Sequence, residues 1–175
     1  MLIDESLVVS MKAGKEAAFS ACYQKLSPYV YSVILRICGR PAIAEEIMQD
    51  SFIQAFSSLD KLQKNTHFYG WIKRIAFNKT LNHLRQQKDT QEITDEHCDE
   101  ATVFDKTIMQ ENQLAYLMGH LPSEAKMVIW LFIVEGYSHK EIAGMTGKTV
   151  SYSKSLVSRN LEKLRVKNLG AEYAL

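Results

Sequence analysis

Apolar side chains recur every three or four residues along most of this chain, which is the spacing of an amphipathic helix. The run Val30, Val33, Ile34 and Ile37 is one example. No stretch alternates apolar and polar residues in the way that a half-buried strand would. The pattern therefore predicts an all-α protein.

The first half of the chain is expected to form helices at about residues 5–12, 15–26, 30–38, 41–59 and 68–87. Pro41 suits the first position of its helix, because proline there loses no helical hydrogen bond. Pro28 either interrupts the second helix or begins the third. Residues 62–67 are polar and are expected to be a loop. The buried side of the last helix is expected to contain Phe68, Trp71, Ile72, Ile75, Leu81 and Leu84.

Residues 88–111 lack helical periodicity and are rich in Asp, Glu and Thr, which is typical of a linker. Beyond them, helices are expected at 113–119 and 122–135. The sequence therefore predicts two small helical domains and a flexible acidic linker between them, at residues 1–88, 112–175 and 89–111.

The charge follows the same division, although the whole chain has a net charge of only +1. Residues 1–87 carry a net charge of +4, residues 88–112 of −6 and residues 113–175 of +3. Two mildly basic modules around an acidic segment suggest two nucleic-acid-binding surfaces and a tether that stays away from the nucleic acid.

The C-terminal region has the pattern of a helix-turn-helix. Gly136 can end the preceding helix, and Ser138 with Glu141 forms a capping box for the next one. Ile142 and the small Ala143 form the apolar face of that helix, and Gly147 supplies the turn after it. Such a unit usually places its second helix in the major groove of DNA, although the pattern also fits an αα-hairpin within a bundle.

The second helix of this unit begins at Thr149, whose hydroxyl can cap it. Helical spacing places Val150, Val157, Leu161 and Leu164 on the inward face. The outward face is then expected to contain Ser151, Tyr152, Lys154, Ser155, Ser158 and Arg159.

The sequence offers no constellation for catalysis or for metal binding. Cys22, Cys38 and Cys98 are odd in number and widely spaced, so they predict neither a disulfide framework nor a zinc site. There is no phosphate-binding glycine loop and no pairing pattern of a nucleophile with a base. We therefore expect no enzymatic activity, no metal and no other cofactor.

The chain shows no membrane signal. Asp4 and Glu5 stand where a signal peptide would have a basic region, and the longest apolar run, 127–134, is too short to cross a bilayer. Unpaired cysteines also fit a reducing compartment. We expect a cytoplasmic protein without stable membrane insertion.

Three sequence blocks, at 44–52, 68–78 and 121–143, follow one another in the order found in a known family. With them, the chain resembles a sigma factor of bacterial RNA polymerase, of the extracytoplasmic-function type within the sigma-70 family. The resemblance implies that the first domain binds core RNA polymerase and melts the minus-10 element of promoter DNA. It also implies that the second domain binds the minus-35 element as duplex, and that an anti-sigma factor is a further partner.

The resemblance also implies roles for single residues. The polymerase-docking face corresponds to Glu45, Glu46, Gln49 and Asp50. Contacts to the minus-10 strand correspond to Lys73, Arg74, Asn78, Lys79, Asn82 and Arg85, beside a loop at 62–68 that captures a flipped base. The minus-35 contacts fall on the outward face of the last helix. Plain solvated helix faces and a plain solvated linker are the alternatives.

The chain departs from the family pattern at four positions. Asn82 stands where aspartate is usual, and Lys148 and Ser153 stand where aliphatic residues are usual. Leu156 replaces an arginine. Polar groups at inward positions and the absence of that arginine are expected to weaken or redirect minus-35 binding.

Two other classes of protein remain as alternatives. A stand-alone helix-turn-helix regulator would leave the blocks at 44–52 and 68–78 without a purpose. A helical protein-interaction module would use its basic residues only for solubility. Co-purification with core polymerase separates the sigma factor from both.

Overall fold

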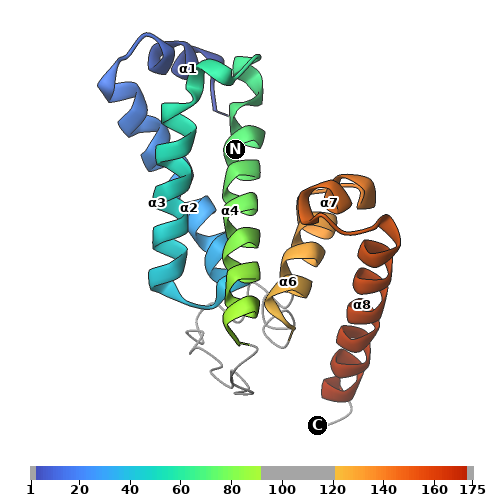
Figure 1. The fold of residues 1–175 in the computed structure, drawn as a ribbon. Coiled ribbons are helices and arrows are strands. Elements are labelled where there is room, and N and C mark those ends of the chain that lie inside the picture. The colour runs from blue at the N-terminus through green and yellow to red at the C-terminus, as the bar shows by residue number, and fades with distance from the viewer. Residues whose placement is uncertain (1–2, 92–120, 173–175) are drawn as a thin grey trace. The chain divides into compact units, whose positions relative to one another are not determined.

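The computed structural model of the protein describes residues 3–91 and 121–172, and the side chains of 3–87 and 121–165. Every regular element in these ranges is a helix (Figure 1), as the sequence predicts. The chain forms two compact units, Met1–Gln86 and Gln87–Leu175. The expected linker lies outside the described residues except for its first three, which continue a helix to Gln91.

The first unit consists of four α-helices, α1 Glu5–Lys12, α2 Glu16–Cys38, α3 Pro41–Ser57 and α4 Phe68–Gln91. Local signals fix several of their ends. The Asp4 carboxylate accepts the backbone N–H of Ser6 at 3.2 Å and caps α1. Gly39 ends α2 with a φ of 70°, a left-handed conformation that favours glycine. Pro41 occupies the first turn of α3, as expected.

The expectation that Pro28 interrupts a helix or begins a new one is wrong, because α2 continues through it. Proline has no N–H, so the carbonyl of Gln24 loses its usual helical partner. Leu26 and Val30 on either side are only 0% and 3% exposed. Burial of this apolar face is the stabilisation that opposes the break.

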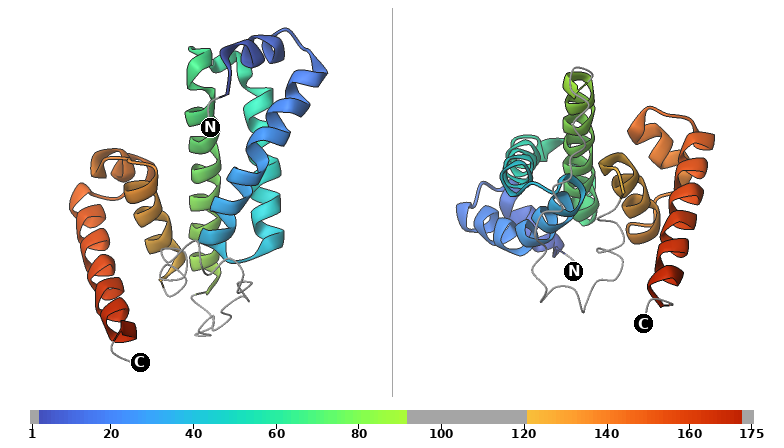
Figure 2. Two further views of the ribbon diagram at one scale, coloured as in Figure 1. Left: turned by 180° about the vertical axis from the view of Figure 1, so that it is seen from behind. Right: turned by 90° about the horizontal axis from the view of Figure 1, so that it is seen from below.

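The core of the first unit forms where α2, α3 and α4 lie side by side, with α1 at one end (Figure 2). Phe68 is fully buried, as predicted. Trp71 is only half-buried and packs edge-on against Phe68, so it lies at the rim of the core. Two hydroxyls inside the unit are satisfied within their own helices, since Ser51 donates to the Ile47 carbonyl at 2.6 Å and Thr80 to Ala76 at 2.8 Å.

The expected loop at 62–67 contains a short 3₁₀ turn, η2 Asn65–His67, and a second such turn, η1 Leu59–Lys61, comes just before it. Between them Leu62 is buried, and its carbonyl accepts a hydrogen bond from Lys12 Nζ at 2.9 Å. The segment is therefore fixed to α1 before the chain enters α4.

The second unit contains α6 Ser123–Ile129, η4 Trp130–Val134, α7 His139–Thr146 and α8 Val150–Glu172. The single helix expected at 122–135 is α6 followed by η4, a wider π-helical turn in which the Glu135 N–H donates to the Trp130 carbonyl at 3.1 Å. The Trp130 indole N–H also donates to the Glu135 carboxylate at 3.3 Å. The helix expected at 113–119 lies outside the described residues.

The capping box predicted for α7 is confirmed. The Glu141 N–H donates to Ser138 Oγ at 3.3 Å, and the Ser138 N–H donates to Glu141 Oε2 at 2.8 Å. Gly136 and Gly147 have φ values of 72° and 65°, so both predicted turns need glycine. Thr149 Oγ1 accepts the Tyr152 N–H at 3.0 Å and caps α8, as predicted.

The inward face of α8 differs from the predicted one. Val150 is 39% exposed, whereas Leu156 is buried at 7%. Val157 and Leu164 are buried as expected, and Leu161 is half-buried. The side of α8 that is buried in the unit therefore contains Ser153, Leu156, Val157, Asn160 and Leu164.

Replacing Ser138 with alanine is expected to lower the free energy of unfolding of the second unit by about 0.5–2 kcal/mol. The substitution leaves the Glu141 N–H without its side-chain acceptor. Trp71 and Trp130 are the two tryptophans of the chain, so urea unfolding of this unit can be followed by Trp130 fluorescence in a Trp71→Phe background.

The control for this prediction is Ser158→Ala, an exposed serine within α8. It is expected to change the free energy of unfolding by no more than about 0.5 kcal/mol. Equal effects of the two substitutions would mean that the capping box adds no stability.

Candidate functional site

One face of α3 is acidic and fully solvent-facing. Glu45, Glu46, Gln49 and Asp50 are all exposed, whereas the opposite side of the helix is buried in the core. The Gln49 amide donates to Glu45 Oε1 at 3.1 Å, which aligns the two side chains along the helix. We call these four residues the acidic face of α3.

The acidic face continues into an exposed apolar side chain that the sequence analysis missed. Ile53 lies one turn after Gln49 and is 66% exposed. A single exposed aliphatic side chain is common on protein surfaces. The face therefore combines negative charge, an amide and an aliphatic group.

A polar strip runs along α4. Arg74, Asn78, Asn82 and Arg85 are exposed and succeed one another at helical spacing, so their side chains share one side of α4. We call these four residues the polar strip. It presents two cations and two amides, which can contact phosphates and base edges respectively.

Lys73 and Lys79 flank the strip and are half-buried. Lys73 Nζ lies 4.4 Å from the centroid of the Tyr69 ring, and the Tyr29 ring is 5.9 Å from that of Tyr69. The structure thus holds Lys73 by a cation–π contact, which is worth about 0.5–1 kcal/mol at an exposed site.

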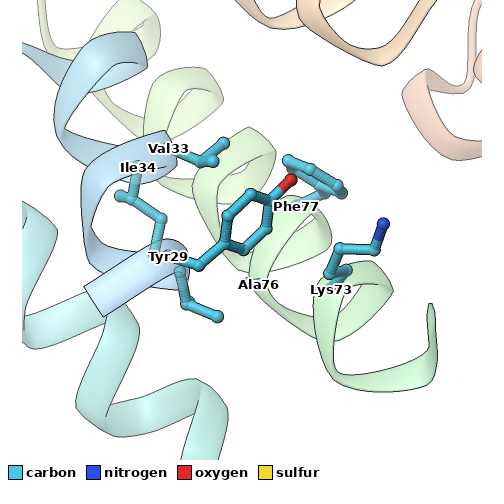
Figure 3. Close-up of a pocket in the computed structure, with 7 residues that line it drawn as sticks. Tyr29, Val33, Ile34, Lys73, Ala76 and Phe77 are labelled. Atoms are coloured by element: carbon cyan, nitrogen blue, oxygen red, sulfur yellow. The ribbon is translucent and has the colours of Figure 1, made fainter. Parts of the chain in front are cut away.

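Lys73 and Tyr29 line a shallow recess between α2 and α4 (Figure 3), where Tyr29 reaches from α2 toward Phe77 of α4. The rest of the lining is almost wholly aliphatic carbon, from Val33, Ile34 and Ala76 among others. Such a lining fits a packing gap between helices better than a ligand site.

Lys79, which flanks the polar strip of α4, contacts the acidic face of α3. Its Nζ lies 3.2 Å from Asp50 Oδ2, so a cation expected to contact DNA is paired with a carboxylate of the acidic face. The exposed fractions of the two side chains are 28% for Lys79 and 57% for Asp50. A partly exposed ion pair of this kind contributes about 0.2–1 kcal/mol, because water screens the attraction.

The segment 62–68 presents polar side chains between two buried anchors. Leu62 and Phe68 are 6% and 0% exposed, whereas Lys64, Thr66 and His67 are exposed. The segment is therefore anchored at both ends, and the polar side chains between the anchors are accessible from solvent.

The outward face of α8 contains the expected residues with one exception. Ser151, Lys154, Ser155, Ser158 and Arg159 are exposed, as predicted. The Arg159 Nε donates to the Ser155 carbonyl at 3.2 Å, so the guanidinium lies back along the helix.

Tyr152 is the exception, because it is half-buried rather than free on the outward face. Its hydroxyl donates to Glu124 Oε1 of α6 at 2.9 Å, and Lys148 Nζ lies 5.8 Å from its ring centroid. Burial raises the pKa of Tyr152, and so do the hydrogen bond and the charge of Glu124. The hydroxyl is thus already bonded within the unit.

The polar residues expected to weaken packing behave differently from each other. Lys148 is exposed and is not an inward residue. Ser153 is 1% exposed, and its hydroxyl is 3.0 Å from Nδ1 of His139, whose ring stacks on Phe132 at 4.3 Å. The buried hydroxyl of α8 therefore has a partner on α7, and no unpaired polar group results there.

The described residues hold no group of three or more His, Cys, Asp or Glu side chains that could bind a metal ion. Cys22 and Cys38 form no disulfide, and burial raises the pKa of the Cys22 thiol to about 12. In the same part of the chain, no helix has the length and apolar content needed to span a bilayer.

Two family models match this chain in succession. Residues 22–90 match Sigma-70 region 2, and residues 111–164 match Sigma-70 region 4. The "ECF RNA polymerase sigma-E factor" of Escherichia coli (strain K12) is 26% identical over 178 residues, with 93% of each chain covered. The protein of the same name from Haemophilus influenzae is also 26% identical, with 95% of each chain covered.

Two solved structures have the same fold. One is CnrH in complex with the cytosolic domain of CnrY, at 20% identity and a TM-score of 0.59, covering 95% of this chain and 97% of that one. The other is the sigma factor RpoE in complex with the anti-sigma factor NepR from Bartonella quintana. It is 18% identical, with a TM-score of 0.57, and covers 84% of this chain and 94% of that one.

Tyr152→Phe is expected to lower the free energy of unfolding of the second unit by about 0.5–1.5 kcal/mol, because the hydrogen bond to Glu124 can no longer form. In a Glu124→Ala background the same substitution should cost close to nothing, since the acceptor is already absent. Urea unfolding followed by Trp130 fluorescence measures both. An equal cost in the two backgrounds would contradict the hydrogen bond.

The same pair predicts a pH dependence. The pKa of folded Tyr152 is raised above its ordinary value of 10.0, so its stabilising contribution is complete below pH 10. The contribution disappears as the pH rises through the folded-state pKa. The difference in stability between the wild type and Tyr152→Phe should therefore shrink above pH 10, whereas a constant difference would argue against this assignment.

Proposed function

This chain belongs to the sigma-70 family and is an alternative sigma factor that acts in transcription initiation, and we propose a separate role in initiation for each of its candidate surfaces. We propose that the first unit binds core RNA polymerase and melts the minus-10 element, and that the second binds the minus-35 element as duplex. The observation that carries the proposal is the match of regions 2 and 4, in order, to the two units. The protein is then an initiation factor rather than an enzyme.

The acidic face of α3 is the proposed docking surface. Its three carboxylates and Gln49 suit a basic coiled coil of the polymerase, and Ile53 adds an apolar contact. The buried opposite side of α3 fixes the backbone of this face, so little backbone ordering opposes binding.

The polar strip of α4, with Lys73 and Lys79 beside it, is the proposed minus-10 surface. Single-stranded DNA needs cations along its backbone and groups that can contact unstacked bases. The exposed arginines supply the first, and Asn78 and Asn82 supply amides for the second. The segment 62–68 at the start of α4 is the proposed site for an extruded base.

The outward face of α8 is the proposed minus-35 surface. Ser151 and Ser155 lie toward the N-terminal end of the helix, which enters deepest into the major groove in helix-turn-helix proteins. Lys154 and Arg159 are the proposed phosphate contacts, and the exposed Ser158 is a further proposed DNA contact. Tyr152 contributes through its ring edge, because its hydroxyl is bonded to Glu124.

We further propose that the two domains comprise residues 1–88 and 112–175. The acidic segment at 89–111 is then the linker that joins them. An anti-sigma factor is a proposed partner, by analogy with the relative whose structure contains NepR. The site of action is the cytoplasm, where polymerase and promoter DNA are found.

A stand-alone helix-turn-helix regulator is the alternative function. It would use α7 and α8 but would have no use for the acidic face of α3. Binding to core polymerase is therefore the measurement that separates the two functions.

Changing Glu45, Glu46 and Asp50 together to lysine is expected to abolish binding to core polymerase. The three substitutions turn a negative face into a positive one opposite a basic partner. Affinity is measured by fluorescence anisotropy of the labelled protein titrated with core enzyme, and circular dichroism checks the helical content.

The matched control is the triple variant Glu5→Lys, Glu16→Lys and Asp60→Lys. It makes the same change in net charge at exposed positions outside α3, and it should retain affinity for the polymerase. Wild-type affinity in the α3 variant would refute the docking surface, and so would equal reductions of affinity in both variants.

Alanine at Lys154 or Arg159 is expected to weaken binding of duplex DNA whatever its sequence, because phosphate contacts carry no sequence information. The dependence of log affinity on log salt concentration should become shallower by about 0.9 for each phosphate that is no longer neutralised. Titrations of a preferred minus-35 duplex and a scrambled duplex, at several salt concentrations, measure both quantities.

Alanine at Ser151 or Ser155 should instead narrow the difference in affinity between the preferred and scrambled duplexes. These two variants and the two basic ones serve as controls for each other. A change of sequence preference without a change of salt dependence in Lys154→Ala would show that the faces of α8 are assigned wrongly.

A further inference from the structure

Asp50 and Lys79 form a contact between the two surfaces of the first unit. Asp50 belongs to the acidic face of α3, and Lys79 lies beside the polar strip of α4, 29 residues farther along the chain. The distance of 3.2 Å from Lys79 Nζ to Asp50 Oδ2 makes them an ion pair. One group of the proposed polymerase surface is therefore bonded to one group of the proposed DNA surface.

The two partners differ in how accessible they are. The Asp50 side chain is 57% exposed, so a cation of a partner protein can reach its carboxylate from solvent. The Lys79 side chain is only 28% exposed. A phosphate that approaches the Lys79 ammonium in this arrangement also meets the negative charge of Asp50, which opposes its binding.

We propose that Asp50 restrains Lys79 in the free protein and that docking on core polymerase releases Lys79 for DNA. This inference rests on the proposed function, because it takes the acidic face of α3 as the docking surface. A basic side chain of the polymerase competes with Lys79 for the Asp50 carboxylate. The released ammonium then binds a phosphate of the melted promoter strand.

The ion pair has the properties that such an exchange needs. A partly exposed pair is weak and screened by water, so a partner can replace one member, whereas a buried pair would resist the exchange. The coupling must also be reciprocal, because it is a free energy shared by two binding equilibria. Any factor by which docking raises the affinity for DNA is the factor by which DNA raises the affinity for polymerase.

The first test is a double-mutant cycle in the full-length protein, with Asp50→Asn, Lys79→Met and their combination. Binding of a labelled single-stranded thymidine oligonucleotide is measured by anisotropy at several salt concentrations. Asp50→Asn should bind more tightly at low salt, and the slope of log affinity against log salt should steepen by about 0.7, the value for one added phosphate contact. Between 50 and 200 mM salt its affinity should then fall by about 2.6-fold more than that of the wild type.

The control for general charge effects is Glu46→Gln, which removes a carboxylate from the same face of α3. Its effect on oligonucleotide binding should be the same with and without Lys79. The effect of Asp50→Asn should exceed that of Glu46→Gln only when Lys79 is present. Circular dichroism melts check that every variant keeps its helical fold.

The reciprocal test uses core polymerase and no DNA. Lys79→Met should raise the affinity for core polymerase, because it frees the Asp50 carboxylate, and it should have no such effect in the Asp50→Asn background. Arg74→Met, which removes a cation from the same helix away from Asp50, controls for the removal of positive charge.

Two results would overturn the inference. One is an equal gain in oligonucleotide binding from Asp50→Asn with and without Lys79. The other is a polymerase affinity of Lys79→Met no higher than that of Arg74→Met. Failure of the proposed function gives a different result, in which the wild-type protein has no affinity for core polymerase. In that case the double-mutant cycle with the oligonucleotide still decides whether Asp50 restrains Lys79.

Discussion

The burial of the apolar stripes of α2, α3 and α4 against one another is the constraint on which both surfaces of the first unit depend. Ile47 and Phe52 on α3 and Ile72 on α4 are buried in one core. Because the apolar sides of α3 and α4 are buried in this core, the acidic face of α3 and the polar strip of α4 face solvent. The candidate surfaces of this unit are therefore the sides of helices that the core leaves uncovered.

In the second unit, polar contacts help to fix the geometry beside the buried apolar core. Capping at Ser138 and Thr149 sets where α7 and α8 begin, and Gly147 sets the turn between them. The contacts of Ser153 with His139 and of Tyr152 with Glu124 then tie α8 to its neighbours. At position 153, where an aliphatic residue is usual in the family, this chain has a serine that hydrogen-bonds to His139 of α7.

Charge connects the two kinds of surface in the first unit. A surface that binds a basic protein and a surface that binds DNA have opposite signs, so neighbouring helices that carry them attract each other. The pair formed by Asp50 and Lys79 is the point at which this attraction becomes a direct contact. The proposed link between binding on the two surfaces uses this contact.

The sequence by itself determined which of the described segments are helical, several of the helix ends and most of the outward residues, because these depend on signals within a few residues of each other. The spacing of Ile47, Met48 and Phe52 already placed Glu45 and Asp50 on the opposite side of α3, and the capping box needed only residues 138–141. The sequence could not reveal contacts that depend on how helices cross. Tertiary packing decided that Lys79 pairs with Asp50 and that Tyr152 is half-buried. It also decided that Val150 is exposed and Leu156 is buried. The same holds for Pro28, since local propensity predicts a break there and only the burial of its neighbours opposes it.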